Sequence, residues 1–142
     1  MPGPVALAAL AVLSALVASL PARAEHEVYY RYVVLGYVEA AGGGPLHDQR
    51  VEVVRDKTGF SYLGETDNDG LFVVVTRLGD ESLGETLTLR VGARSTRLVA
   101  RFDPTNHVDE RGTRIDLVGD RFVERAAQFR ATLARFLASP AP

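Results

Sequence analysis

The chain has 142 residues, a usual length for a single folded domain. Hydrophobic residues make up 46% of it and charged residues 24%, which is the composition of a globular protein rather than a disordered one. The formal net charge of −2 argues against a nucleic-acid-binding protein, because such proteins usually carry a basic face. The absence of cysteine excludes disulfides, thiolate metal sites and cysteine nucleophiles.

An apolar segment stands at the N-terminus of the chain. Every residue from Val5 to Leu20 is Ala, Val, Leu or Ser, and Ala22-Arg23-Ala24 follows. An apolar core before an A-x-A sequence is typical of a secretory signal peptide. We expect residues 1–24 to be a signal peptide that is cleaved after Ala24, which places the protein in the periplasm or outside the cell. The alternative is a membrane anchor formed by residues 4–22, although a spanning helix needs about 20 apolar residues.

Residues 25–118 are expected to form one β-sheet domain. Apolar and polar residues alternate along much of this segment, which is the period of a half-buried strand. Short stretches rich in Gly, Asp and Asn separate the alternating runs. The pattern predicts seven strands, over residues 28–38, 51–55, 60–66, 71–76, 86–91, 95–102 and 113–118. Seven short strands separated by turns indicate an antiparallel β-sandwich.

The acidic segment between the third and fourth predicted strands, residues 67–70, has two interpretations. With Glu65 as its first position, Glu65-x-Asp67-x-Asp69-Gly70 resembles the start of a calcium loop, but an EF-hand needs a bidentate acid at its twelfth position, where this chain has Thr76. The flanking segments are also predicted strands rather than helices. We therefore expect a tight hairpin turn in which Gly70 takes a positive φ.

A helical period follows Gly119. The apolar side chains that fall on one face of a 3.6-residue wheel are Phe122, Ala126, Phe129, Leu133, Phe136 and Leu137. Asp120 is a suitable N-cap, and arginines come late in the segment, as the helix dipole favours. The pattern predicts an amphipathic helix over residues 119–138, followed by a short tail over residues 139–142.

Four short segments of the β-rich region carry a family resemblance. They are Gly36-Tyr37-Val38, Gly44-Pro45-Leu46, Val51-Glu52-Val53 and Thr66-Asp67-Asn68-Asp69-Gly70-Leu71-Phe72. Together they resemble carboxypeptidase regulatory-like domains, which belong to the transthyretin-like (prealbumin-like) β-sandwiches. The resemblance covers residues 28–118 and implies a seven-stranded antiparallel transthyretin-like sandwich. The basic residues are arginines apart from Lys57, which is typical of a GC-rich bacterial genome and favours a bacterial exported protein.

The resembled family consists mostly of non-catalytic accessory modules, so the resemblance implies a binding role. We expect an exported protein that is not an enzyme and that binds another protein of the periplasm or inner membrane. The predicted helix is the expected docking element, through Phe122, Arg125, Phe129, Arg130, Leu133 and Phe136. Three alternatives are open for what its apolar side packs against: its own sandwich, a partner protein, or the surface of a membrane in peripheral contact.

A glycan- or metal-binding module is the alternative function. The aromatic residues that suggest stacking on sugars are Tyr29, Tyr30, Tyr32 and Tyr37, all in one predicted strand. The candidate metal ligands His26, His47 and His107 are scattered, and the sequence does not decide whether they converge.

A small transthyretin-like hydrolase is the least favoured function. The serines at 61, 82 and 95 lack a Gly-x-Ser-x-Gly elbow, and the chain ends in an arginine-rich segment instead of the Tyr-Arg-Gly-Ser motif of related hydrolases. No catalytic residue, metal, cofactor or nucleic acid is therefore assigned.

Overall fold

The computed structural model describes residues 27–139, and within them the fold is mainly β. The strands are β1 (Tyr30–Glu39), β2 (Arg50–Arg55), β3 (Phe60–Glu65), β4 (Leu71–Leu78), β5 (Thr86–Val91), β6 (Arg94–Val99), β7 (Arg111–Val118) and β8 (Arg121–Glu124). Two short 3₁₀ helices, η2 (Asp80–Ser82) and η3 (Ala126–Gln128), and one α-helix, α2 (Phe129–Ala138), complete this part of the chain. The predicted signal peptide, or anchor, lies outside the described residues.

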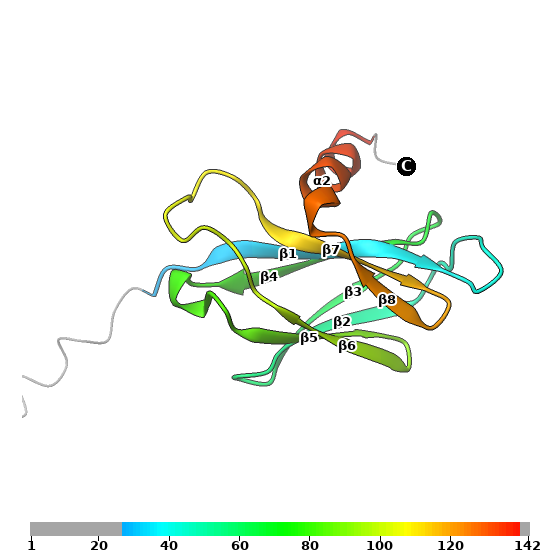
Figure 1. Ribbon diagram of the computed structural model, residues 1–142, viewed down its shortest axis with the longest axis horizontal. Helices are drawn as coiled ribbons and strands as arrows, with labels where there is room; N and C mark the ends of the chain where they lie inside the picture. Colours follow the sequence, from blue (N-terminus) through cyan, green and yellow to red (C-terminus); the bar gives the residue numbers. More distant parts are fainter. Residues whose placement is uncertain (1–26, 140–142) are drawn as a thin grey trace, which may run out of the picture.

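The strands form two four-stranded sheets that enclose a common core (Figure 1). One sheet has the order β4-β1-β7-β8 and the other the order β3-β2-β5-β6. Their inner faces meet through alternating apolar side chains, as the period of two requires. Val34 and Phe72 from the first sheet and Val53 and Leu89 from the second are completely buried in this core. A two-sheet, sandwich-like architecture is therefore confirmed.

The central pair of the first sheet differs from the predicted antiparallel arrangement. β1 and β7 run parallel, with Tyr32 opposite Arg111 and Val38 opposite Leu117, whereas every other ladder between the described strands is antiparallel. The prediction of a wholly antiparallel sheet was wrong because parallel pairing joins segments distant in the sequence. Between β4 and β7 the chain forms β5 and β6 of the second sheet, and β7 then returns to the first sheet in the direction of β1.

The segment over residues 67–70 is a tight turn, as predicted, but it does not close a paired hairpin. The carboxylate Oδ1 of Asp67 accepts hydrogen bonds from the backbone N–H groups of Asp69 (2.9 Å) and Leu71 (3.0 Å), and Gly70 has a φ of 77°. β3 on one side of the turn pairs with β2, and β4 on the other side pairs with β1. The turn therefore carries the chain from one sheet to the other.

The predicted helix over residues 119–138 was wrong in its first half. Phe122 lies in β8 opposite Leu117 of β7, so an eighth strand replaces the first turns of the helix. Gly119, with a φ of 64°, allows the tight turn between β7 and β8. Phe122 satisfies both a helical and an alternating pattern, and pairing with β7 decides between them because it provides backbone hydrogen bonds and contact with the main core.

Helix α2 packs on the outer face of the first sheet (Figure 1). Phe129 and Leu133 are 3% and 6% exposed and contact Val33 and Leu35 of β1. Gly112 permits this approach, because a Cβ atom there would lie 2.6 Å from Cζ of Phe129. The protein's own sheet, one of the three alternatives left open above, therefore covers Phe129 and Leu133, whereas Phe136 and Leu137 on the same helix are 41% and 67% exposed.

No helix among residues 27–139 is long and apolar enough to cross a membrane.

Candidate binding groove beside the C-terminal helix

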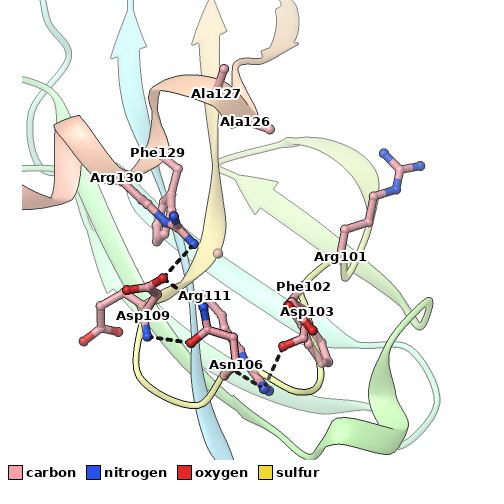
Figure 2. Close-up of a pocket in the computed structure, with 12 residues that line it drawn as sticks. Arg101, Phe102, Asp103, Asn106, Asp109, Arg111, Ala126, Ala127, Phe129 and Arg130 are labelled. Carbon is pink, nitrogen blue, oxygen red and sulfur yellow. Dashed lines mark hydrogen bonds and ion pairs between the residues drawn. The ribbon is translucent and has the colours of Figure 1, made fainter.

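A groove lies between α2 and the loop over residues 101–110 (Figure 2). It consists of a cavity of about 320 Å³ and an adjoining one of about 210 Å³, which share Asp109, Glu110 and Arg130. We call these two cavities the helix groove. Its apolar lining comprises Phe102, Gly112, Ala126, Ala127, Phe129, Leu133, Ala134 and Leu137. The groove therefore has one wall from the loop and the other from η3 and α2.

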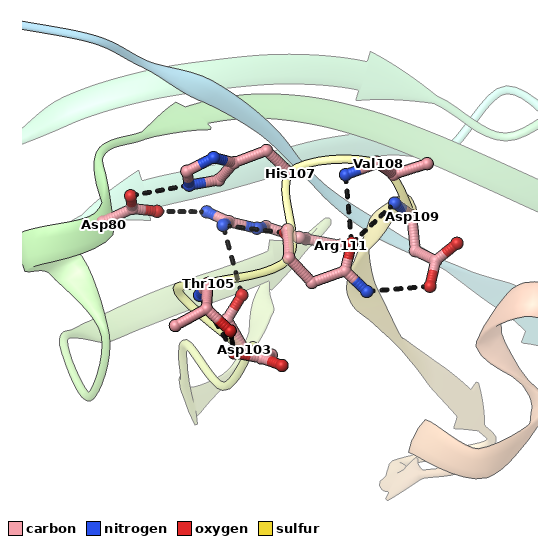
Figure 3. A network of polar contacts seen from close by, with 8 residues as sticks. Asp80, Asp103, Thr105, His107, Val108, Asp109 and Arg111 are labelled. Carbon is pink, nitrogen blue, oxygen red and sulfur yellow. Dashed lines mark hydrogen bonds and ion pairs between the residues drawn. The ribbon is translucent and has the colours of Figure 1, made fainter.

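Arg111 fixes the loop wall from beneath (Figure 3). Its side chain is 6% exposed, and Nη1 lies 2.9 Å from Oδ1 of Asp80 in η2. Nη2 donates hydrogen bonds to the backbone carbonyls of Asp103 (3.2 Å) and Asn106 (3.1 Å). The guanidinium also lies 4.3 Å from the ring centroid of Phe102 and 4.8 Å from that of Tyr30. One buried cation thus joins β7, η2, β1 and the loop.

His107 makes a second connection between the loop and η2. Its Nε2 lies 2.8 Å from Oδ2 of Asp80, and its ring stacks on Tyr30 with centroids 4.3 Å apart. Desolvation raises the pKa of the Asp80 carboxyl, but the hydrogen bonds and the electrostatic attraction from His107 and Arg111 together lower it by more, so this pKa lies below its ordinary value. Asp80 is therefore a carboxylate at neutral pH, able to bind the side chains of His107 in the loop and Arg111 in β7.

Local hydrogen bonds shape the remainder of the loop. Oδ1 of Asp103 accepts hydrogen bonds from the backbone N–H (2.9 Å) and the hydroxyl (2.7 Å) of Thr105, and these bonds lower the pKa of Asp103. The side-chain carbonyl of Asn106 accepts from the backbone N–H groups of Val108 and Asp109. Asp and Asn side chains commonly stabilise turns in this way. The loop wall is therefore preorganised by its own sequence.

Arg130 and Asp109 face each other across the groove (Figure 2). Nη2 of Arg130 lies 3.8 Å from Oδ2 of Asp109, and the two side chains are 70% and 53% exposed. An ion pair this long and this exposed contributes less than about 1 kcal/mol. Both side chains can therefore give up this contact and bind a ligand instead, at a small cost in free energy.

The six residues predicted for partner binding divide into two groups. Phe129, Arg130 and Leu133 line the helix groove. The other three residues, Phe122, Arg125 and Phe136, lie outside its lining. Phe122 packs against the core, Nη1 of Arg125 lies 3.2 Å from the buried carboxylate of Asp116, and Phe136 is 41% exposed on α2.

Sequence reasoning missed the loop wall, including Arg111 and Phe102. The only local signal is the turn chemistry of Asp103 and Asn106, which indicates a shaped loop but not what lies beside it.

The four N-terminal tyrosines do not form a common sugar-binding face. Tyr32 is 1% exposed in the core, where burial raises its pKa to about 12. Tyr30 stacks on His107, and Tyr37 lies beneath the guanidinium of Arg114 at 5.0 Å. Tyr29 alone among them is an exposed large hydrophobic residue, at 42%.

The histidines inside the described part of the chain do not converge. His47 contacts Asp48 in the loop between β1 and β2, while His107 contacts Asp80. His26 lies outside the described residues. Among residues 27–139, no three side chains of the types His, Cys, Asp and Glu are grouped so that they could hold a metal ion.

No protein-family model matches the chain, and no curated protein matches it.

Proposed function

We propose that this protein is an exported, non-catalytic binding module that takes a segment of a partner protein into the helix groove. The groove lies on a two-sheet scaffold for which we propose a transthyretin-like relationship, on the strength of the family resemblance of residues 28–118. The observation that carries the proposal is the combination of a preorganised loop wall with an apolar helix wall. Rigid walls reduce the entropy lost on binding.

The shape and charge of the groove favour a peptide segment. Two adjoining cavities suit an extended ligand better than a compact one. The lining combines apolar side chains with charged side chains of both signs. Among the charged residues, Arg130 and Asp109 form only a weak ion pair with each other. Backbone amides and side chains of a partner would find both apolar contact and hydrogen-bond partners there.

The chemistry of the lining supports binding rather than catalysis. Its residues include no Ser, Thr or His that would supply a nucleophile or an imidazole base. Of its carboxylates, Glu110 pairs with Arg31 at 2.7 Å and Asp109 accepts a hydrogen bond from Asn106 at 2.9 Å. Glu110 therefore serves a structural contact, whereas Asp109 is held by Asn106 and only weakly by Arg130.

The test is site-specific photo-crosslinking followed by measurement of affinity. A photoreactive phenylalanine analogue at Ala127, in the groove, should crosslink a protein in the exported fraction. The same analogue at Ala131, exposed on α2 but outside the lining, should not. The crosslinked segment of that protein is then synthesised and its affinity measured with the purified protein.

Filling the groove should abolish binding of this segment. Ala127→Trp is expected to weaken its affinity at least tenfold, because the indole occupies the groove, whereas Ala131→Trp should leave the affinity unchanged. Equal affinity of both variants, with thermal stability retained, would refute the proposal.

A further inference from the structure

A cluster of exposed aromatic rings lies away from the helix groove, where the edges of the two sheets come together. We call Tyr29, Phe60 and Tyr62 the aromatic shelf. Phe60 and Tyr62 are 4.9 Å apart between ring centroids in an edge-to-face arrangement, and Phe60 is 60% exposed. A cavity of about 330 Å³ lies over the shelf and is also lined by Arg55, Thr58 and Arg77. None of its lining residues belongs to the helix groove.

The topology brings these rings together. Phe60 and Tyr62 are two residues apart in β3, so they lie on one face of that strand. β3 is the edge strand of its sheet, and the hydroxyl of Tyr62 donates a 3.3 Å hydrogen bond to the carbonyl of Arg77 in β4, the edge strand of the other sheet. Tyr29 directly precedes β1. The shelf therefore combines residues from two segments that are distant in the sequence.

Hydrogen-bond donors accompany the aromatic rings. Arg55 is fixed by bonds from Nε and Nη2 to the carboxylate of Glu85 (2.7 and 2.8 Å) and by a bond from Nη2 to Ser82 (3.2 Å). Nη1 of Arg55 makes no side-chain hydrogen bond with residues 27–139. It is also not one of the fully buried side-chain atoms that lack a hydrogen-bond partner in this part of the chain. Arg55 therefore presents an oriented donor whose positive charge Glu85 already balances.

Hydroxyl groups complete the lining. Tyr29, Tyr62 and Thr58 each carry one, and a hydroxyl both donates and accepts hydrogen bonds. In the free protein, Tyr29 donates to Glu27, Tyr62 donates to the Arg77 carbonyl, and Thr58 accepts from the backbone N–H of Phe60. Each of these contacts leaves hydrogen-bonding capacity unused.

A pyranose ring has the complementary pattern of groups. It has an apolar face of C–H groups and a periphery of hydroxyls that donate and accept. An apolar ligand would leave Nη1 of Arg55 and the unused hydrogen-bonding capacity of the hydroxyls unsatisfied, which is unfavourable in a desolvated site. Because Glu85 already balances the charge of Arg55, this residue serves the site as a hydrogen-bond donor rather than as an unpaired positive charge. We propose that the aromatic shelf binds a neutral pyranose unit of a polysaccharide, with Phe60 and Tyr29 stacking on the ring and Arg55 donating to its hydroxyls.

The experiment measures binding of neutral sugars to the protein purified from the exported fraction. Maltohexaose, cellohexaose and chitohexaose are each added to ¹⁵N-labelled protein, and amide chemical shifts are followed. We expect at least one of them to bind with saturable shifts at Tyr29, Thr58, Phe60, Tyr62 and Arg77. Absence of saturable shifts with all three, or shifts that map elsewhere, would overturn the proposal.

Two variants on one strand provide a matched control. Phe60→Ala removes a shelf ring that is 60% exposed, and Leu63→Ala removes a side chain that is 62% exposed on the other face of β3. Phe60→Ala should weaken sugar binding at least tenfold, while Leu63→Ala and the groove variant Ala127→Trp leave it unchanged. Equal binding by Phe60→Ala and Leu63→Ala would overturn the proposal. The proposal would also be overturned if the protein bound phosphatidylcholine vesicles instead of the sugars and this binding depended on Phe60.

Discussion

Arg114 and Asp116 form a two-bond ion pair beneath helix α2, with Nε and Nη2 of the guanidinium 3.0 and 2.8 Å from the two carboxylate oxygens. Asp116 is 4% exposed at its side chain and also accepts a hydrogen bond from the backbone N–H of Tyr37. The same Arg114 donates through Nη1 to the hydroxyl of Thr132 in α2 at 3.1 Å. This pair therefore connects the helix to the sheet on which it packs.

Replacing Asp116 with Ala should strongly destabilise the protein. The substitution leaves the Arg114 charge, 15% exposed, without its partner, and breaking a buried pair from one side costs about 3–5 kcal/mol. Urea unfolding measures this loss. The exposed counterpart Asp109→Ala, which removes the contact with Arg130, should cost less than about 1 kcal/mol. Similar losses for both substitutions would contradict the assignment of Asp116 as a structural carboxylate.

The packing of α2 on the sheet predicts unequal effects for two phenylalanines of the same helix. Phe129→Ala should cost about 3–5 kcal/mol of unfolding free energy, because the ring is 3% exposed against β1. Phe136→Ala should change it by about 0.5 kcal/mol or less, because that ring is 41% exposed. Thermal and urea unfolding decide the question. A wild-type stability for Phe129→Ala would mean that the helix is not part of the core in solution.

Close contact between β1, β7 and α2 makes Gly112 sensitive to substitution. A Cβ atom there would lie 2.0 Å from the carbonyl oxygen of Val33 and 2.6 Å from Cζ of Phe129. Gly112→Ala should therefore destabilise the fold by about 1–3 kcal/mol, the usual cost of overpacking. Gly42→Ala serves as the control, since a Cβ atom at that position meets nothing within 4 Å. Differential scanning calorimetry of both variants tests the contact.

The Arg55–Glu85 pair predicts how stability responds to acid. The hydrogen bond from Arg55 lowers the pKa of Glu85 below its ordinary value of 4.5, so the folded state favours the carboxylate. The resulting stabilisation is complete above pH 4.5 and is lost as the pH falls through the lower, folded-state pKa. Glu85→Gln should therefore reduce the acid-induced fall in unfolding free energy below pH 4.5, as measured by urea unfolding at a series of pH values. An unchanged pH profile would show that the pair does not persist in solution.

Export predicts a defined N-terminus for the mature protein. The apolar run over residues 5–20 followed by Ala22-Arg23-Ala24 should direct cleavage after Ala24, because signal peptidase requires small side chains at the two alanine positions. N-terminal sequencing of exported protein should begin at Glu25. Intact Met1 in the membrane fraction would support the anchor alternative instead.

Local sequence determined much of this protein's secondary structure. Alternation placed the seven predicted strands close to β1–β7, because side chains on one face of a half-buried strand recur every second residue. The turn at Asp67 and Gly70 followed from a carboxylate that binds nearby N–H groups and a residue that tolerates positive φ. Phe129 and Leu133 followed from helical spacing. Each of these features depends on residues within a few positions of one another.

Tertiary structure alone decided which of these segments meet. The parallel pairing of β1 with β7, the ion pair of Arg111 with Asp80 and the cavity lined jointly by Tyr29, Phe60 and Tyr62 bring together residues distant in the sequence. Phe122 fitted a helix and a strand equally well, and only the available edge of β7 made it a strand residue. Periodicity reports which face of an element is apolar, whereas the identity of the covering element depends on the packing of the whole chain.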